Sequence, residues 1–125
     1  MATILIVEDS PDNMKLFRAV LTLRGHEVMG LAGGDALMAT IERTTPDLVL
    51  MDIQLPGKDG FALLKDIRES PHRGLRVVAL TAHAMSGDRE RALEAGFDGY
   101  ITKPIDIHGF PGLVQRVLSS EVIST

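Results

Sequence analysis

The chain alternates short apolar runs with stretches whose apolar residues follow helical spacing. Residues 3–7, 48–51 and 77–80 are apolar on both pleat faces, which is typical of strands buried on both sides in a parallel sheet. Residues 27–31 and 99–102 form weaker runs, and we expect these two strands nearer the edges of the sheet. The pattern therefore predicts five strands.

Each predicted strand is followed by a segment with helical spacing. In the first segment, Met14, Phe17 and Leu21 recur at steps of three and four residues, and Gly25 is a typical stop signal. The same reasoning predicts five helices, over residues 12–24, 35–43, 61–69, 88–95 and 110–118. Aspartate is a favoured N-cap, so we expect caps at the aspartates near three helix starts, Asp12, Asp59 and Asp106.

Five strand–helix repeats with short connections predict an α/β fold. Parallel strands joined by right-handed crossovers place helices on both faces of one sheet, which gives a doubly wound five-stranded parallel sheet. At 125 residues the chain is long enough for one domain with its own core. We expect this domain to cover residues 1–120, and residues 121–125 to form a short, frayed C-terminal tail.

The composition narrows the classes of function. A formal net charge of −4 argues against direct nucleic-acid binding, and the lack of cysteine excludes disulfides, thiolate metal sites and a cysteine nucleophile. The N-terminal segment lacks the basic region of a signal peptide, and no apolar run approaches membrane-spanning length. We therefore expect a cytoplasmic protein without membrane insertion.

Polar residues stand where the predicted strands end. Glu8 and Asp9 follow the first strand and Asp52 follows the third. Thr81 follows the fourth strand and Lys103 follows the fifth. In an open α/β sheet the working site lies beyond the carboxyl ends of the strands. We therefore expect these side chains to meet at one edge of the sheet.

The chemistry of this set indicates phosphoryl transfer. Three carboxylates at close range repel one another, and a divalent cation offsets that repulsion. An all-oxygen set without Cys or convergent His favours Mg²⁺ over zinc or copper. A lysine and a threonine hydroxyl beside the metal would bind phosphoryl oxygens, and one carboxylate could act as nucleophile.

Four motifs then make the family recognisable. The sequences VEDS, LVLMDIQLPGKDG, TAHAMSGD and YITKP occur in an order and spacing that resemble a response-regulator receiver domain of two-component signalling. The resemblance covers essentially the whole chain, and the wording around the acidic pair is similar to that of single-domain receivers. It implies a flavodoxin-like (βα)5 fold with strand order 2-1-3-4-5.

The resemblance also implies roles for the acidic residues. Asp52 matches the phosphoacceptor, whose carboxylate attacks phosphorus to give an acyl phosphate. Asp9 matches the direct Mg²⁺ ligand, and Glu8 is expected to act on the metal through water. Gln54 matches the position that offers its backbone carbonyl to the metal, so its side-chain type should matter little there.

The remaining matches concern the phosphoryl group and the switch. Lys103 matches the lysine that contacts the phosphoryl group, and Pro104 follows it in a peptide that the family tends to hold cis. Thr81 matches the switch hydroxyl and Tyr100 the switch aromatic. We expect phosphorylation to draw Thr81 toward the phosphoryl oxygen, after which Tyr100 turns inward. This would change a protein-binding face made by the fourth helix, fifth strand and fifth helix.

The resemblance implies a signalling protein and not an enzyme that turns over a metabolite. The phosphoryl donor would be a histidine kinase or a histidine phosphotransfer protein, and the output would be contact with a downstream protein target. The domain would catalyse only its own phosphorylation and its own slow dephosphorylation.

Alternatives from other classes fit the residues less well. A haloacid-dehalogenase-type phosphatase needs its nucleophilic aspartate on the first strand and a second aspartate two residues later. Here the candidate lies on the third predicted strand, and position 54 is Gln54. A flavodoxin-like cofactor binder is disfavoured by one Tyr, no Trp and no Ser/Thr-rich phosphate loop. Two further alternatives are a receiver used only for docking and a fragment of a longer regulator with an output domain.

Three features depart from the usual family pattern or vary within it. The segment 107–112 is rich in Gly and Pro, and Pro111 suits a first helical turn, so we expect the last helix to begin late. Lys58 lies in a loop where the family often has Met. His83 lies two residues past Thr81, near the expected phosphoryl entrance, and could tune the lifetime of the modification.

Overall fold

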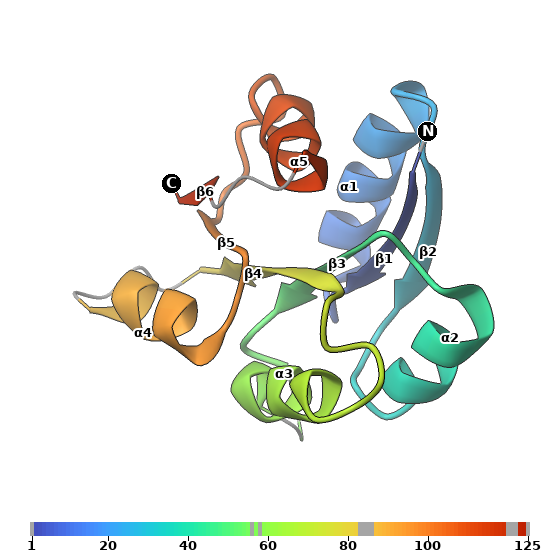
Figure 1. The fold of residues 1–125 in the computed structure, drawn as a ribbon. Coiled ribbons are helices and arrows are strands. Elements are labelled where there is room, and N and C mark those ends of the chain that lie inside the picture. Colours follow the sequence, from blue (N-terminus) through green and yellow to red (C-terminus); the bar gives the residue numbers. More distant parts are fainter. Residues whose placement is uncertain (1, 56, 58, 83–86, 120–122, 125) are drawn as a thin grey trace.

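A computed structural model describes residues 2–55, 57, 59–82, 87–119 and 123–124 of the chain (Figure 1). The strands are β1 (Thr3–Val7), β2 (Glu27–Leu31), β3 (Leu48–Asp52), β4 (Arg76–Thr81), β5 (Gly99–Thr102) and β6 (Ile123–Ser124). The helices are α1 (Pro11–Leu23), α2 (Leu37–Thr44), α3 (Gly60–Arg68), α4 (Asp88–Ala95) and α5 (Phe110–Leu118).

The strands form one parallel sheet in the order β2-β1-β3-β4-β5-β6. The predicted α/β class and the order 2-1-3-4-5 are confirmed. The sheet has a sixth strand that was not predicted, because β6 pairs in parallel with β5. This strand lies in the segment that we expected to be a frayed tail. Two residues are too few to show a periodic pattern, so only the pairing of the backbone reveals the strand.

Two hydrophobic cores lie on opposite faces of the sheet. Helices α1 and α5 cover one face, and α2, α3 and α4 cover the other (Figure 1). Along β1, Leu5 and Val7 belong to the core under α2–α4, whereas Ile4 and Ile6 belong to the core under α1 and α5. Successive side chains of a strand point to opposite faces, so a strand covered on both sides must be apolar throughout.

Helix α3 begins at the predicted cap, but α1 does not. The side chain of Asp59 accepts a hydrogen bond from the Phe61 N–H at 2.9 Å, as an N-cap should. Ser10, and not Asp12, caps α1, and its hydroxyl accepts a hydrogen bond from the Asn13 N–H at 3.3 Å. Ser10 has the extended backbone that a cap requires, and Asp12 already lies within the first turn.

Helix α5 begins late, as the Gly- and Pro-rich segment predicts. Its first residue is Phe110, and Pro111 lies in its first turn. The prediction that Asp106 caps this helix is wrong, since Gly109 occupies the N-cap position. The Asp106 carboxylate instead accepts a hydrogen bond from the His108 N–H at 3.1 Å, within the turn before the helix. Helix α2 begins at Leu37, two residues later than expected.

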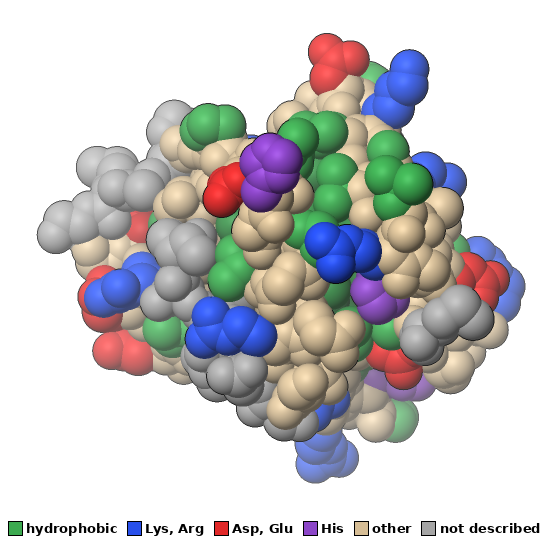
Figure 2. All heavy atoms as spheres, turned by 90° about the horizontal axis from the view of Figure 1, so that it is seen from above, with side chains coloured by type: hydrophobic (Ala, Val, Ile, Leu, Met, Phe, Trp, Pro, Cys, Tyr) green, Lys and Arg blue, Asp and Glu red, His purple; other side chains and the backbone are tan. Residues whose placement is uncertain are grey.

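The side of the molecule that carries α1 and α5 has hydrophobic side chains on its surface. Viewed from above, these side chains gather in a central band with Lys and Arg side chains around it (Figure 2). Leu16 and Leu23 of α1 are 39% and 86% exposed, and Ile107 before α5 is 44% exposed. In the part of the chain that the structure describes, no helix is long and apolar enough to cross a membrane.

Candidate functional site

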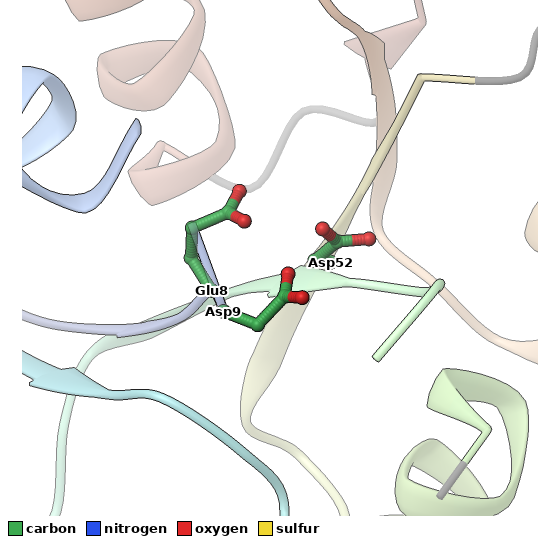
Figure 3. Close-up of side chains that lie close together, drawn as sticks. All are labelled: Glu8, Asp9 and Asp52. Carbon is green, nitrogen blue, oxygen red and sulfur yellow. The ribbon is translucent and has the colours of Figure 1, made fainter. Parts of the chain in front are cut away.

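Three carboxylates meet at the carboxyl edge of the sheet. Strands β1 and β3 are paired with Val7 opposite Met51, so Glu8 and Asp52, the next residues, come to the same edge. One oxygen each from Glu8, Asp9 and Asp52 lies within 4.8 Å of the others. Figure 3 shows the three side chains turned toward a common space. Glu8 and Asp52 are 2% and 4% exposed, whereas Asp9 is open to solvent.

Lys103 joins this cluster from the end of β5, which is separated from β3 by β4. Its Nζ lies 2.8 Å from Oδ2 of Asp52 and 2.5 Å from Oε1 of Glu8. The backbone N–H of Lys103 donates to the Thr81 carbonyl at 2.7 Å, which holds the residue at the end of β4. The Lys103–Pro104 peptide bond is cis, as the resemblance implies. The lysine therefore bridges two buried carboxylates.

The pKa shifts follow from this arrangement. Burial alone would lower the pKa of Lys103, but its hydrogen bonds with Asp52 and Glu8 outweigh burial and raise the pKa. Burial raises the pKa of Glu8, although hydrogen bonds from Lys103 and from the Ser10 N–H act in the opposite direction. Lys103 is thus held as a cation, and burial makes the ionised form of Glu8 costly.

The turn after β3 fixes the orientation of the Asp52 carboxylate. Its Oδ1 accepts a hydrogen bond from the Gln54 N–H at 2.8 Å, which leaves Oδ2 facing Lys103. The Ile53 N–H donates to the Leu80 carbonyl at 3.0 Å, so the turn is also attached to β4. Gln54 therefore lies beside the acidic cluster, as predicted, and its carbonyl as a metal ligand stays a prediction.

Thr81 and Tyr100 lie on neighbouring strands but at different depths. Asp52 is paired with Leu80, so Thr81 is one residue beyond that level, and it is 1% exposed. Tyr100 pairs with Ala79 in the interior of the sheet and is 2% exposed. Its hydroxyl has no hydrogen-bond partner among the described residues. The Tyr100 ring therefore lies inward in this structure.

Two residues near the site were not singled out by the sequence pattern. Ser10 donates its N–H to Oε2 of Glu8 at 3.1 Å, so the residue that caps α1 also positions an acidic side chain. Gly60 packs so closely on the turn after β3 that an added Cβ would lie 2.6 Å from the Ile53 Cα. Both contacts depend on the path of the backbone in the turns after β1 and β3, and the sequence shows no signal for that path. His83 and Lys58 lie outside the described residues.

Comparisons with known proteins identify the family of the chain. A family model described as the response regulator receiver domain matches residues 4–115. The chain belongs to this family. Membership assigns it to the receivers and not to the phosphatase or flavin-binding alternatives.

Two curated relatives differ in how much of their own length matches this chain. The polar-differentiation response regulator DivK of Brucella anthropi is 39% identical over 117 residues, which is 93% of this chain and 95% of that protein. The sensor protein GacS of Pseudomonas syringae is 42% identical over 106 residues, which is 82% of this chain. The match spans only 12% of the length of GacS.

Solved structures of receivers have the same fold. A LuxR-family response regulator from Aurantimonas matches with a TM-score of 0.90 and 30% identity, over 98% of this chain and 89% of that one. The receiver domain of a sensor histidine kinase from Pseudomonas aeruginosa matches with a TM-score of 0.81 and 36% identity, over 97% of both chains. That structure has a magnesium ion coordinated in its active-site cleft.

Proposed function

We propose that Asp52 is the phosphoacceptor of this receiver and that a phosphohistidine supplies the phosphoryl group. The observation that carries the proposal is the cluster at the end of β3. There a buried carboxylate lies 2.8 Å from an ammonium group and within 4.8 Å of two other carboxylates. The donor is the phosphohistidine of a histidine kinase or a histidine phosphotransfer protein.

The transfer itself is a displacement at phosphorus. A carboxylate oxygen of Asp52 forms the new P–O bond while the P–N bond of the donor breaks, and the departing imidazole keeps the electron pair and takes up a proton. Lys103, released from Oδ2 of Asp52, pairs with a phosphoryl oxygen, and the Thr81 hydroxyl donates to another. Hydrolysis by water later restores the Asp52 carboxylate and releases inorganic phosphate. The domain thus catalyses only its own modification and its reversal.

The acidic cluster fits a magnesium ion. Its donors are all oxygen atoms, which suits Mg²⁺, and the described residues offer no Cys or His ligand beside them. Asp9 and Asp52 would bind directly, together with the Gln54 carbonyl. Glu8 is engaged by Lys103 and by the Ser10 N–H, which supports its action through water. When bound, Mg²⁺ offsets the charge that accumulates where carboxylates and phosphoryl oxygens meet.

The output is a change of the face formed by α4, β5 and α5, which a downstream protein contacts. Phosphorylation adds about −1.5 to −2 charge at Asp52, and Thr81 responds by moving toward the phosphoryl group. The inward position of Tyr100 is the one that this structure shows, with the side chain buried. Phosphorylation would favour the conformation in which the ring is inward. A cytoplasmic setting stays a prediction of the sequence.

Intact-mass spectrometry with acetyl phosphate tests the site. The wild-type protein should gain one phosphoryl group when Mg²⁺ is present and none after Mg²⁺ is chelated. Asp52→Asn should gain none under either condition. Asp59→Asn is the matched control, because it makes the same change of charge on an exposed residue and asparagine caps a helix as well as aspartate. Equal modification of Asp52→Asn and wild type would show that another residue is the acceptor.

A further inference from the structure

Strand β5 lacks the features that usually protect the edge of a sheet. Proteins blunt exposed edges with charged residues, proline or bulges, because unpaired N–H and C=O groups invite another strand. The sequence of β5, GYIT, contains neither charge nor proline, and its first three residues are buried. At the opposite edge, β2 begins with the exposed Glu27 and is only partly buried elsewhere. Without a neighbour on its outer side, β5 would be open to strand pairing.

The C-terminal strand β6 covers this edge. Gly99 pairs with Ile123 and Tyr100 with Ser124, both in parallel. Figure 1 shows β6 at the outer side of β5, next to the ribbon of α5. The pairing therefore falls on the face formed by α4, β5 and α5, and it includes the backbone of Tyr100.

We propose that residues 123–124 are a built-in cap that occupies the outer edge of β5 and must leave before another extended segment can pair there. The surface beneath the cap is a strand-docking edge, and its ligand is an extended peptide that adds to the sheet in parallel. The occupancy of the edge by β6 does not depend on phosphorylation. Its consequence for signalling rests on the proposed function, because the downstream partner is expected on the same face.

The cap lowers the fraction of molecules in which the outer edge of β5 is open. A partner that needs the open edge binds with an apparent affinity reduced by the fraction of molecules in which the edge is open. Each backbone hydrogen bond is worth a modest net free energy, so a two-residue strand changes the open fraction by about threefold to tenfold. A cap of this strength is displaced readily by a longer partner strand.

Amide hydrogen exchange tests whether the cap is docked. Alternate N–H groups of a parallel strand point to opposite neighbours. Since the Lys103 N–H donates to the Thr81 carbonyl of β4, the Gly99 and Ile101 N–H groups should also face β4, and the Tyr100 N–H should face β6. In the variant Ile123→Pro/Ser124→Pro, the Tyr100 amide should exchange about threefold to tenfold faster than in the wild type, and the Ile101 amide should exchange at an unchanged rate.

The control variant Ile123→Val/Ser124→Thr keeps residues that favour strands and should exchange as the wild type does. Equal exchange of the Tyr100 amide in wild type and in the proline variant would overturn the proposal. Faster exchange throughout β1 and β3 would also overturn it, because that result would indicate general destabilisation.

A titration tests whether the edge accepts a separate segment. The probe is a synthetic peptide, SSEVIST, with the sequence of residues 119–125. In NMR spectra of the isotopically labelled full chain, the peptide should shift the amide signal of Tyr100 in the proline variant and leave that of the wild type in place. Equal shifts in both proteins, or shifts in neither, would contradict the proposal. Both experiments use unphosphorylated protein, so a failure of Asp52 to accept phosphate would leave them interpretable.

Discussion

Replacing Lys103 by methionine would remove the cation that bridges Asp52 and Glu8 while keeping a side chain of similar length. The two carboxylates have side chains only 6% and 0% exposed, and each has its ion pair with this one ammonium group. In the variant both would be left buried at close range with no positive partner. We therefore expect Lys103→Met to lower the free energy of unfolding at neutral pH.

The structure sets the size of this loss. Removal of one partner from a fully buried ion pair costs about 3–5 kcal/mol. The Lys103 side chain is 13% exposed, and Asp9 opens the cluster to solvent, so water can reach part of the site. We expect a loss of about 2–3 kcal/mol, which for a domain of this size lowers Tm by about 10 °C.

The loss should depend on pH in a defined direction. The pKa of Glu8 is already raised above 4.5, mainly by burial, and loss of Lys103 raises it further. A carboxyl group with a raised folded-state pKa contributes stability below its unfolded pKa, and that contribution is lost as the pH rises through the folded-state value. The gap between variant and wild type should therefore narrow as the pH falls from about 7 toward 5.

Urea unfolding followed by far-UV circular dichroism measures the effect, since the chain has no Trp. The experiment is done in chelator and repeated with saturating Mg²⁺, which should restore more stability to the variant than to the wild type. Lys15→Met is the matched control because Lys15 is exposed on α1. A loss of less than about 0.5 kcal/mol at neutral pH in chelator would refute the reasoning, because that size is typical of surface substitutions.

Three other predictions follow from contacts away from Lys103. Arg68→Ala should cost about 1.5–3 kcal/mol in urea unfolding, because its guanidinium donates to three backbone carbonyls and to Asp98. Gly60→Ala should cost about 1–3 kcal/mol and slow phosphorylation by acetyl phosphate, because the new Cβ would press on Ile53 beside the acceptor. Burial lowers the pKa of His26, so wild-type stability should fall as the pH drops below 6.5, and His26→Asn should flatten that part of the profile.

Each of these three predictions has a control variant or an outcome that would contradict it. Arg89→Ala should change stability by less than about 0.5 kcal/mol, since Arg89 is 54% exposed and pairs with the exposed Glu90. Gly74→Ala should be tolerated, because nothing lies within 4 Å of its added Cβ. Identical pH profiles for wild type and His26→Asn between neutral and acidic pH would contradict the reasoning for His26.

Much of the fold was predictable from spacing alone. The continuous apolar runs of β1 and β3 showed that both faces of the sheet are covered, because an exposed face would have required alternating polar residues. Polar residues at the ends of these runs then placed Glu8, Asp9 and Asp52 at one edge, and the structure brings them together. The late start of α5 was also predictable, because proline fits the first turn of a helix.

Helix caps show the limit of local prediction. Ser10 and Asp12 are both good capping residues, and the choice depends on which of them adopts an extended backbone as the chain leaves β1. Asp106 failed as a cap because the turn before α5 uses its carboxylate for another hydrogen bond. A residue type states what a side chain can do, and the path of the backbone decides whether it does so.

The sequence by itself determined the alternation of strands and helices, the two-sided burial of the sheet and the residues that gather at its carboxyl edge. Only the tertiary structure decided that Lys103 bridges two carboxylates, that Tyr100 lies inward and that β6 covers the outer side of β5. The physical reason is the range of the interactions. Periodicity records which face of its own element a residue occupies, whereas ion pairs and strand pairing join segments far apart along the chain.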